Sequence, residues 1–200
     1  MSDRHLAEPG EAAGFLDGYL ASLPDAAPGQ VGACTFVTPL GQMIAVAGRA
    51  LHLLEFTDTN RLPKQLKAVG ALSVGRGRVP LIDRLEAELS AYLAGCGQTF
   101  SILLAPQGTA FQQCVWQALG TVPFGARASY SVIAGRIGRP NAVRAVGAAN
   151  GANPIAILIP CHRIVARDGA LTGYGGGVSR KQQLLALEGQ ETQGSSGESA

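Results

Sequence analysis

Residues 129–151 have the sequence SYSVIAGRIGRPNAVRAVGAANG, which predicts two short helices joined by a tight turn. We expect the first helix from Ser131 to Ile137 and the second from Ala142 to Ala149, with Asn141 as the N-cap of the second. Gly138, Arg139 and Pro140 form the predicted turn. Two short helices across a glycine-containing turn form a helix-turn-helix, a motif that often binds DNA.

The second predicted helix lacks the long polar side chains of a helix that contacts base edges in the major groove. Val143 and Val146 are expected to face the core, and Arg144 is its only long side chain. Small residues at i, i+3 and i+7 form a stripe of Ala142, Ala145 and Ala149. This stripe favours close approach to the narrower minor groove with Arg144 as a probe, although an internal helix pair that binds no DNA remains an alternative.

The net charge of +2 hides a basic segment. Residues 127–181 carry eight arginine and lysine side chains against one acidic residue, Asp168, for a net charge of +7. The flanking residues 1–126 and 182–200 are acidic, with net charges of −2 and −3. A basic segment suggests a polyanionic partner in which phosphate is the obvious binding group, or else a solvated basic face.

Composition excludes several classes of protein. The chain has 200 residues, of which 46% are hydrophobic, and its longest uncharged stretch is broken by glycines and prolines, so we expect a globular protein with no membrane span. Residues 1–10 lack the apolar core of a signal peptide, which predicts a cytoplasmic protein, associated with the nucleoid in a bacterium. Cysteines 34, 96, 114 and 161 are widely spaced, so neither a disulfide framework nor a metal site is predicted, and no cofactor is expected.

The fold class that we predict is α/β (α+β), with two domains. Residues 1–28 form an extension expected to be poorly ordered, and residues 29–97 a small antiparallel-sheet domain with strands at 31–38, 43–47 and 51–56 and a helix at 80–93. Residues 98–189 form a mostly helical domain that opens with a strand at 100–104 and a helix capped by Thr109 and Gln112, with Trp116 in its core. Residues 190–200 form a disordered tail.

Nucleophilic chemistry is predicted at Cys161-His162-Arg163, which follows a buried extended run bracketed by Pro154 and Pro160. Electropositive neighbours lower the pKa of a thiol and populate the nucleophilic thiolate. Because adjacent residues rarely point the same way, His162 is expected to reach Cys161 only through water. A buried inert thiol is the alternative, and it is our interpretation of the other three cysteines.

Glu188 lies in the predicted final turn of the last helix, which Gly189 is expected to end. The helix dipole disfavours a carboxylate there, so we infer a functional role in which Glu188 orients His162 in a Cys–His–Glu relay. A solvated glutamate is the alternative.

The glycine-rich segment 173–177 lies between Cys161 and Glu188 in the sequence. Its glycines let the backbone approach a flat ligand closely, and Tyr174 would form one wall of that site.

These motifs together resemble the O6-alkylguanine-DNA alkyltransferases. The resemblance is carried in order by GTAFQQCVWQAL at 108–119, the helix pair at 129–154, PCHR at 160–163, LTGYGGG at 171–177 and LLALE at 184–188. It is close through residues 107–189 and looser back to about residue 30, where TPLGQMIAVAG resembles the family's ribonuclease-H-like amino-terminal domain.

The resemblance implies direct reversal of DNA damage. Cys161 would accept the alkyl group of O6-alkylguanine, and of O4-alkylthymine, once and irreversibly. His162 and Glu188 would activate it, Asn153 would support the preceding turn, and Tyr130 would donate a hydrogen bond to the flipped guanine. Double-stranded DNA would bind through its minor groove to a monomer, with cooperative binding left open.

The resemblance also implies two sets of contact residues. The DNA-binding set is Arg144, which enters the duplex as a finger, with Ala142, Ala145, Ala149, Arg139 and Arg163. The substrate pocket is Thr172, Tyr174, Gly175 and Ile164. Gly175 stands where serine is common and Ile164 where valine is common, so the width of the pocket and the preferred alkyl group stay open.

Three other functions are weighed against this one. A damage sensor that flips alkylguanine without transferring the alkyl group would lack the acceptor cysteine, and Cys161 is present. A thiol hydrolase using Cys161, His162 and Glu188 leaves the basic segment unexplained. A plain helix-turn-helix regulator leaves PCHR unexplained.

Overall fold

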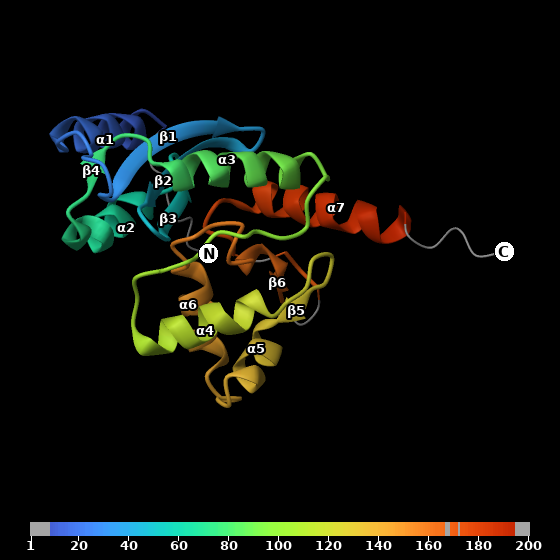
Figure 1. Ribbon diagram of the computed structural model, residues 1–200. Helices are drawn as coiled ribbons and strands as arrows, with labels where there is room; N and C mark the ends of the chain where they lie inside the picture. The colour runs from blue at the N-terminus through green and yellow to red at the C-terminus, as the bar shows by residue number, and fades with distance from the viewer. Residues whose placement is uncertain (1–8, 167–168, 172, 195–200) are drawn as a thin grey trace. The chain divides into compact units, whose positions relative to one another are not determined.

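The computed structural model describes residues 9–166, 169–171 and 173–194, which divide into two compact units (Figure 1). Unit 1 holds the described residues up to Ala87 together with Ser101–Gln107, and unit 2 holds Glu88–Phe100 and the described residues from Gly108 onward. The sequence placed the boundary between residues 97 and 98. The structure instead divides the chain within helix α3 (Pro80–Leu93).

Unit 1 is built on a four-stranded sheet in the order β3-β2-β1-β4. The strands are β1 (Gly32–Thr38), β2 (Gly41–Ala47), β3 (Leu51–Phe56) and β4 (Gly75–Arg76). The first three are antiparallel neighbours, and β4 runs parallel to β1. A tight turn joins β1 to β2 between Thr38 and Gly41, where the Thr38 hydroxyl donates to the Gly41 carbonyl at 2.8 Å. The expected α+β fold class, with its small antiparallel sheet, is confirmed.

Helices α1 (Pro9–Ser22) and α2 (Leu62–Val69), followed by the short 3-10 helix η1 (Gly70–Leu72), share one core with the sheet. The buried members of that core come from both helices and the strands: Leu16, Ala33, Ile44, Val46, Leu53, Leu62, Leu66, Val69 and Val74. The expectation of a poorly ordered extension over residues 1–28 therefore needs correction for the part that the structure describes. Leu16 of α1 is only 3% exposed, and burial of this apolar face outweighs the three glycines that weaken the helix.

The strand expected at 100–104 is replaced by a single bridge between Leu104 and Leu51. The Leu51 amide donates to the Leu103 carbonyl, and the Ala105 amide donates back to the Leu51 carbonyl. Ile102 is 7% exposed and Leu103 is 66% exposed, so burial alternates along the apolar run that suggested a strand. The pairing with Leu51 explains why residues 101–107 belong to unit 1.

Unit 2 contains three mutually packed helices, α4 (Ala110–Gly120), α5 (Tyr130–Arg136) and α6 (Val143–Gly151) (Figure 1). The predicted capping box is confirmed, with Thr109 and Gln112 bonded reciprocally. Trp116 is buried as expected and donates from Nε1 to the Ala149 carbonyl at 2.9 Å. A Cβ at Gly108 would lie 2.4 Å from the indole ring, so only glycine lets the chain pass this side chain.

The predicted helix-turn-helix is present in α5 and α6, but its caps differ from those expected. Ser129 caps α5 by accepting a hydrogen bond from the Val132 amide. Asn141 does not cap α6, because the helix begins one residue later than expected, after Ala142, which has no side-chain cap. Gly138 adopts a left-handed conformation with φ of 68°, which explains the glycine in the turn.

The rest of unit 2 carries the PCHR motif and the last helix. The 3-10 helix η2 (Cys161–Arg163) leads into β6 (Ile164–Val165), which pairs in parallel with β5 (Ala128–Ser129). Helix α7 runs over Val178–Gly194 and so passes Gly189, which was expected to end it. The expected disordered tail 190–200 is corrected for residues 190–194, which are helical, while residues 195–200 lie outside the described residues.

Candidate active site

Cys161 is delivered by a backbone that turns twice within five residues. The Leu158 amide donates to the Ala156 carbonyl at 2.8 Å, which closes a tight turn on Ile157 with φ of 70°. A second such turn on Pro160 is closed by the Cys161 amide on the Ile159 carbonyl at 2.7 Å. A left-handed, β-branched residue costs of order 1–3 kcal/mol and persists only where its surroundings enforce it.

Asn153 supplies much of that enforcement. Its Nδ2 donates to the carbonyls of Ile155 and Ile159 at 3.2 and 2.9 Å, and its Oδ1 accepts from the Ile155 amide at 3.0 Å. The same Nδ2 lies 3.0 Å from Sγ of Cys161, which is 2% exposed. An N–H group that donates to sulfur stabilises the thiolate over the thiol. Asn153 was expected to support the preceding turn, and the structure adds a direct contact between Asn153 and the nucleophile.

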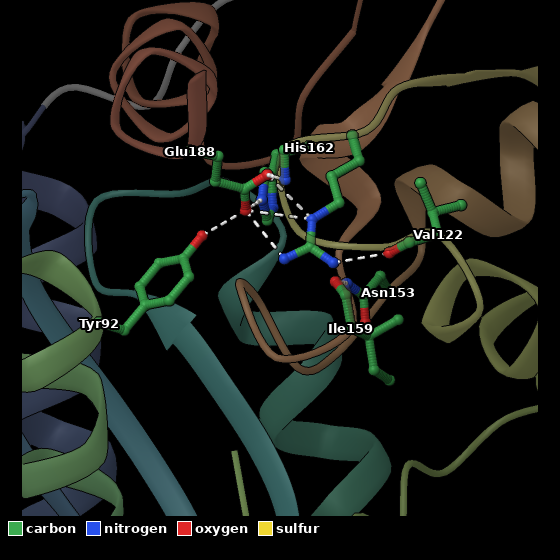
Figure 2. A network of polar contacts seen from close by, with 8 residues as sticks. Tyr92, Val122, Asn153, Ile159, His162 and Glu188 are labelled. Carbon is green, nitrogen blue, oxygen red and sulfur yellow. Dashed lines mark hydrogen bonds and ion pairs between the residues drawn. The ribbon is translucent and has the colours of Figure 1, made fainter. Parts of the chain in front are cut away.

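Glu188 is the centre of a buried polar network (Figure 2). Its Oε1 accepts from Tyr92 Oη at 2.5 Å and from His162 Nε2 at 2.8 Å, and both carboxylate oxygens accept from the Arg163 guanidinium at 2.9–3.1 Å. The Gly125 amide lies 3.3 Å from Oε2. Glu188 and His162 are therefore paired as expected, and the carboxylate is interior, not in a final helical turn.

The electrostatics of this network fix two protonation states. Burial by itself would raise the pKa of Glu188, but the hydrogen bonds from His162 and Arg163 lower it to about 2. Burial also lowers the pKa of His162, an effect that the hydrogen bond to Glu188 opposes and that Arg163 and Lys181 reinforce. At neutral pH Glu188 is ionised and His162 is neutral, with its proton on Nε2. The buried Nδ1 of His162 then carries a lone pair that no described residue contacts by a hydrogen bond.

Arg163 was expected among the DNA-binding residues, and the structure corrects this. It is 8% exposed, its Nη1 donates to the Val122 carbonyl at 2.7 Å, and its guanidinium lies 5.8 Å from the centre of the Phe124 ring. A guanidinium bound in this way neutralises Glu188 inside the protein and is not free to contact phosphate.

Two residues of the network were missed by the sequence reasoning. Tyr92 lies on α3 in the buried stripe that continues from Leu85 and Leu89, where an apolar side chain was expected. Lys181 on α7 is fully buried, and its Nζ donates to the Ile164 carbonyl at 2.5 Å. Burial lowers the pKa of Lys181, while the nearby Cys161 raises it. The lysine's sequence position gave no signal, but the stripe of Leu85 and Leu89 points to Tyr92 at the next helical step.

The expected pocket residues are placed only in part. Tyr174 is buried, and its ring meets that of His162 edge to face, with centroids 6.4 Å apart. Ile164 is fully buried in β6, beside Ala128. Gly175 is half-buried between Gly173 and Gly177, which have φ of 48° and 92°, and Thr172 lies outside the described residues. The structure thus gathers Tyr174 and Ile164 around the Cys161–His162 segment.

Comparison with known proteins agrees with this geometry. The DNA-binding-domain model of the 6-O-methylguanine DNA methyltransferases matches residues 110–190. The methylated-DNA–protein-cysteine methyltransferase of Mycobacterium leprae is 44% identical over 152 residues, which span 76% of this chain and 88% of that protein. The chain belongs to this family. The resemblance drawn from the sequence is confirmed.

This chain matches other members of the methyltransferase family over different shares of their length. The Mycobacterium bovis enzyme of the same name is 56% identical over 101 residues, which cover half of this chain and 61% of that protein. A crystal structure of Mycobacterium tuberculosis OGT in complex with DNA has a TM-score of 0.70 and 40% identity, and covers 80% of this chain and 94% of the other.

Some of the residues that were expected to bind DNA are exposed on the helix-turn-helix of this family member. Arg139, Arg144 and Ala145 are exposed, and Ala142 is half-buried. The assignment of Ala149 to the DNA-binding residues needs correction, because Ala149 is 3% exposed and its carbonyl accepts a hydrogen bond from Trp116. Val143 is 36% exposed, although a core position was expected for it. Tyr130 is half-buried, with its ring 3.9 Å from the position that a Cβ on Gly147 would take.

Within the described part of the chain, the structure has neither a metal-binding cluster nor a helix that could span a membrane. Within residues 9–166, 169–171 and 173–194, no three histidine, cysteine or acidic side chains gather closely enough to bind a metal ion. Over those same ranges no helix has the length and apolar content that a membrane crossing requires.

Proposed function

We propose that this chain repairs DNA by direct reversal, moving the alkyl group of O6-alkylguanine, and of O4-alkylthymine, onto Cys161. The observation that carries the proposal is the environment of one sulfur atom. Sγ of Cys161 lies 3.0 Å from an amide donor, and the next residue, His162, presents an unprotonated Nδ1 while Glu188 holds its Nε2. This arrangement suits a thiol that must be deprotonated and then attack a carbon.

The proposed step balances as a displacement at the alkyl carbon. The thiol proton passes to Nδ1 of His162 through one water molecule, and the thiolate attacks the carbon attached to O6. The carbon–sulfur bond forms as the carbon–oxygen bond breaks, and the electron pair stays on the guanine oxygen. Tyr130 donates a hydrogen bond as that charge develops. The proton held on Nδ1 of His162 is then released to water, and one proton taken from water onto N1 completes ordinary guanine. A thioether is a stable product, so each chain reacts once.

The substrate base must leave the duplex, because Cys161 is 2% exposed and cannot enter a base stack. We propose that α6 lies in the minor groove, where Ala142 and Ala145 allow close approach and Arg144 fills the vacated space. Exposed Arg139 is suited to phosphate. The related M. tuberculosis OGT was solved in complex with DNA, which supports DNA as the partner. We propose that the chain acts as a monomer.

The first test measures stoichiometry. Duplex DNA labelled on the methyl group of O6-methylguanine is incubated with the protein, and we expect at most one label per chain, with none in Cys161→Ala. Cys114→Ala is the matched control, since Cys114 is exposed, and it should keep full transfer. Several turnovers per chain would indicate a hydrolase, and binding of damaged DNA without transfer would indicate a sensor. Either result contradicts the proposal.

The second test separates DNA binding from chemistry. Because Arg144 is assigned to the duplex alone, Arg144→Ala should slow repair of duplex DNA by about 10–100-fold, the range of one lost charged contact, and leave the reaction with free O6-benzylguanine nearly unchanged. Arg49→Ala removes the same charge from an exposed position in unit 1 and should change neither rate. Equal losses on both substrates for Arg144→Ala would exclude the finger role.

A further inference from the structure

Tyr92 lies outside the matched DNA-binding domain and yet contacts the catalytic network. It sits on α3, in the part of that helix that belongs to unit 2, and is 1% exposed. Its ring is held between Phe100 at 5.2 Å and Phe124 at 5.9 Å, measured between ring centroids. Figure 2 shows the hydroxyl pointing to the Glu188 carboxylate, and the donor–acceptor distance is 2.5 Å.

The bond from Tyr92 competes with the bond from His162 for a single oxygen. Oε1 of Glu188 accepts from Tyr92, from His162 Nε2 and from the Arg163 guanidinium, whereas a carboxylate oxygen offers about two lone-pair directions. Each donor withdraws electron density from the carboxylate and makes it a weaker acceptor for the others. Burial and the Glu188 charge raise the pKa of Tyr92, so the phenol stays protonated and remains a donor.

The strength of the His162–Glu188 bond matters because it sets how basic His162 is. Glu188 is the group that favours the protonated imidazole, while burial and the positive charges of Arg163 and Lys181 oppose it. Two further titratable groups among the described residues lie beside His162, the Tyr174 ring and the adjacent Cys161. A donor that weakens Glu188 as an acceptor therefore keeps His162 neutral over a wider range of acid pH.

We propose that Tyr92 is a positioning residue that fixes the Glu188 carboxylate against His162 and limits the basicity of the imidazole, a role that rests on the proposed function of Cys161. Through this contact, α3 contributes to an active site otherwise built from residues after Gly108. Any acceptor would satisfy the buried hydroxyl of a structural tyrosine, but the acceptor of Tyr92 is the same carboxylate oxygen that binds Nε2 of His162.

The test compares the pKa of His162 in Tyr92→Phe and in the unaltered protein, measured by NMR of the imidazole nitrogens. With one donor to Glu188 lost, the pKa of His162 should rise by about one unit, the size expected for one hydrogen bond. The acid limb of the rate of reaction with O6-benzylguanine should move to higher pH by the same amount. At a pH on that limb the rate then falls about tenfold, and at pH 8 it changes little.

A second variant changes the hydrogen bond in the opposite direction without removing it. Placing 3-fluorotyrosine at position 92 makes the hydroxyl a stronger donor, so the pKa of His162 should fall and the acid limb should move to lower pH. Tyr19→Phe is the matched control in unit 1, because the buried Tyr19 hydroxyl makes no hydrogen bond to any described residue. It should leave the His162 titration unchanged.

Two outcomes would overturn the proposal: a lowered melting temperature in Tyr92→Phe with an unchanged His162 titration, or the same shift for both Tyr92 variants. The NMR titration uses no substrate, so it stands even if label transfer to Cys161 fails. Failure of the positioning role and failure of the alkyl-transfer proposal are therefore distinguishable.

Discussion

Among the residues whose burial the structure describes, each unit buries one glutamate beside an arginine, and the two carboxylates behave in opposite ways. In unit 1, Glu55 is fully buried, accepts from the Phe56 amide at 3.0 Å and pairs with Arg61. In unit 2, Glu188 is 1% exposed and accepts from Tyr92, His162, Arg163 and Gly125. Burial raises the pKa of Glu55 despite Arg61, whereas the pKa of Glu188 is lowered to about 2.

The difference teaches that burial by itself does not decide the charge of a carboxylate. Desolvation is the largest influence on both pKa values and acts in the same direction. Glu188 nevertheless stays ionised because its donors include a full guanidinium fork and an imidazole N–H, which together offset the loss of water. Glu188 must stay ionised to orient His162 and therefore needs several hydrogen-bond donors. Glu55 orients no histidine among the described residues and does not need them.

The largest effect expected from this comparison is on stability. Glu188→Gln leaves the buried Arg163 without its counter-charge, and breaking such a pair costs about 3–5 kcal/mol of unfolding free energy. Glu55→Gln should cost about 1 kcal/mol, because the Arg61 side chain is 19% exposed and keeps access to water. Urea denaturation of both variants measures the two values, and equal losses would mean that the extra donors on Glu188 add nothing.

The same pair of variants separates stability from chemistry. Glu188→Gln should also slow the reaction of Cys161 with free O6-benzylguanine, because an amide is a weaker, uncharged acceptor whose NH2 group can also face Nε2, so the tautomer of His162 is no longer fixed. Glu55→Gln is the control and should react at the unaltered rate.

A smaller effect is expected in the acid titration of the two carboxyl groups, followed by carbon NMR. Glu188 should titrate near pH 2 and Glu55 above its ordinary pKa. The stability that Glu188 contributes is complete above the unfolded pKa of about 4.5 and is lost as the pH falls through about 2. Protonation of Glu55 acts in the opposite direction, because the folded state binds that proton more tightly. Titration of both groups in one pH range would contradict the comparison.

Local patterns in the sequence predicted much of this molecule. Strand β3, helix α3 and the Thr109 capping box occur at the expected residues, since each depends on side-chain spacing within one segment. The pairing of His162 with Glu188 was also expected, because a carboxylate near a helix end invited a partner.

The errors have a different physical origin. Arg163 and Ala149 were assigned to the DNA surface from their positions in a motif, but burial by distant segments decides which way such side chains face. Helix α1 lies in the extension that was expected to be poorly ordered, although packing against the sheet stabilises it. The helical stripe of Leu85 and Leu89 indicates that Tyr92 is buried, but the hydrogen bonds that Tyr92 and Lys181 make with remote segments leave no periodic trace in a sequence.

The reach of the Glu188 network also constrains the order of folding. The hydrogen bond between Tyr92 and Glu188 joins positions 96 residues apart, and the carboxylate contacts Gly125, His162 and Arg163 in between. Contacts at such separation are slow to form, because the entropy of loop closure opposes them until intervening elements have folded. The imidazole beside Cys161 therefore acquires its fixed tautomer late, and a partly folded chain has an unactivated thiol.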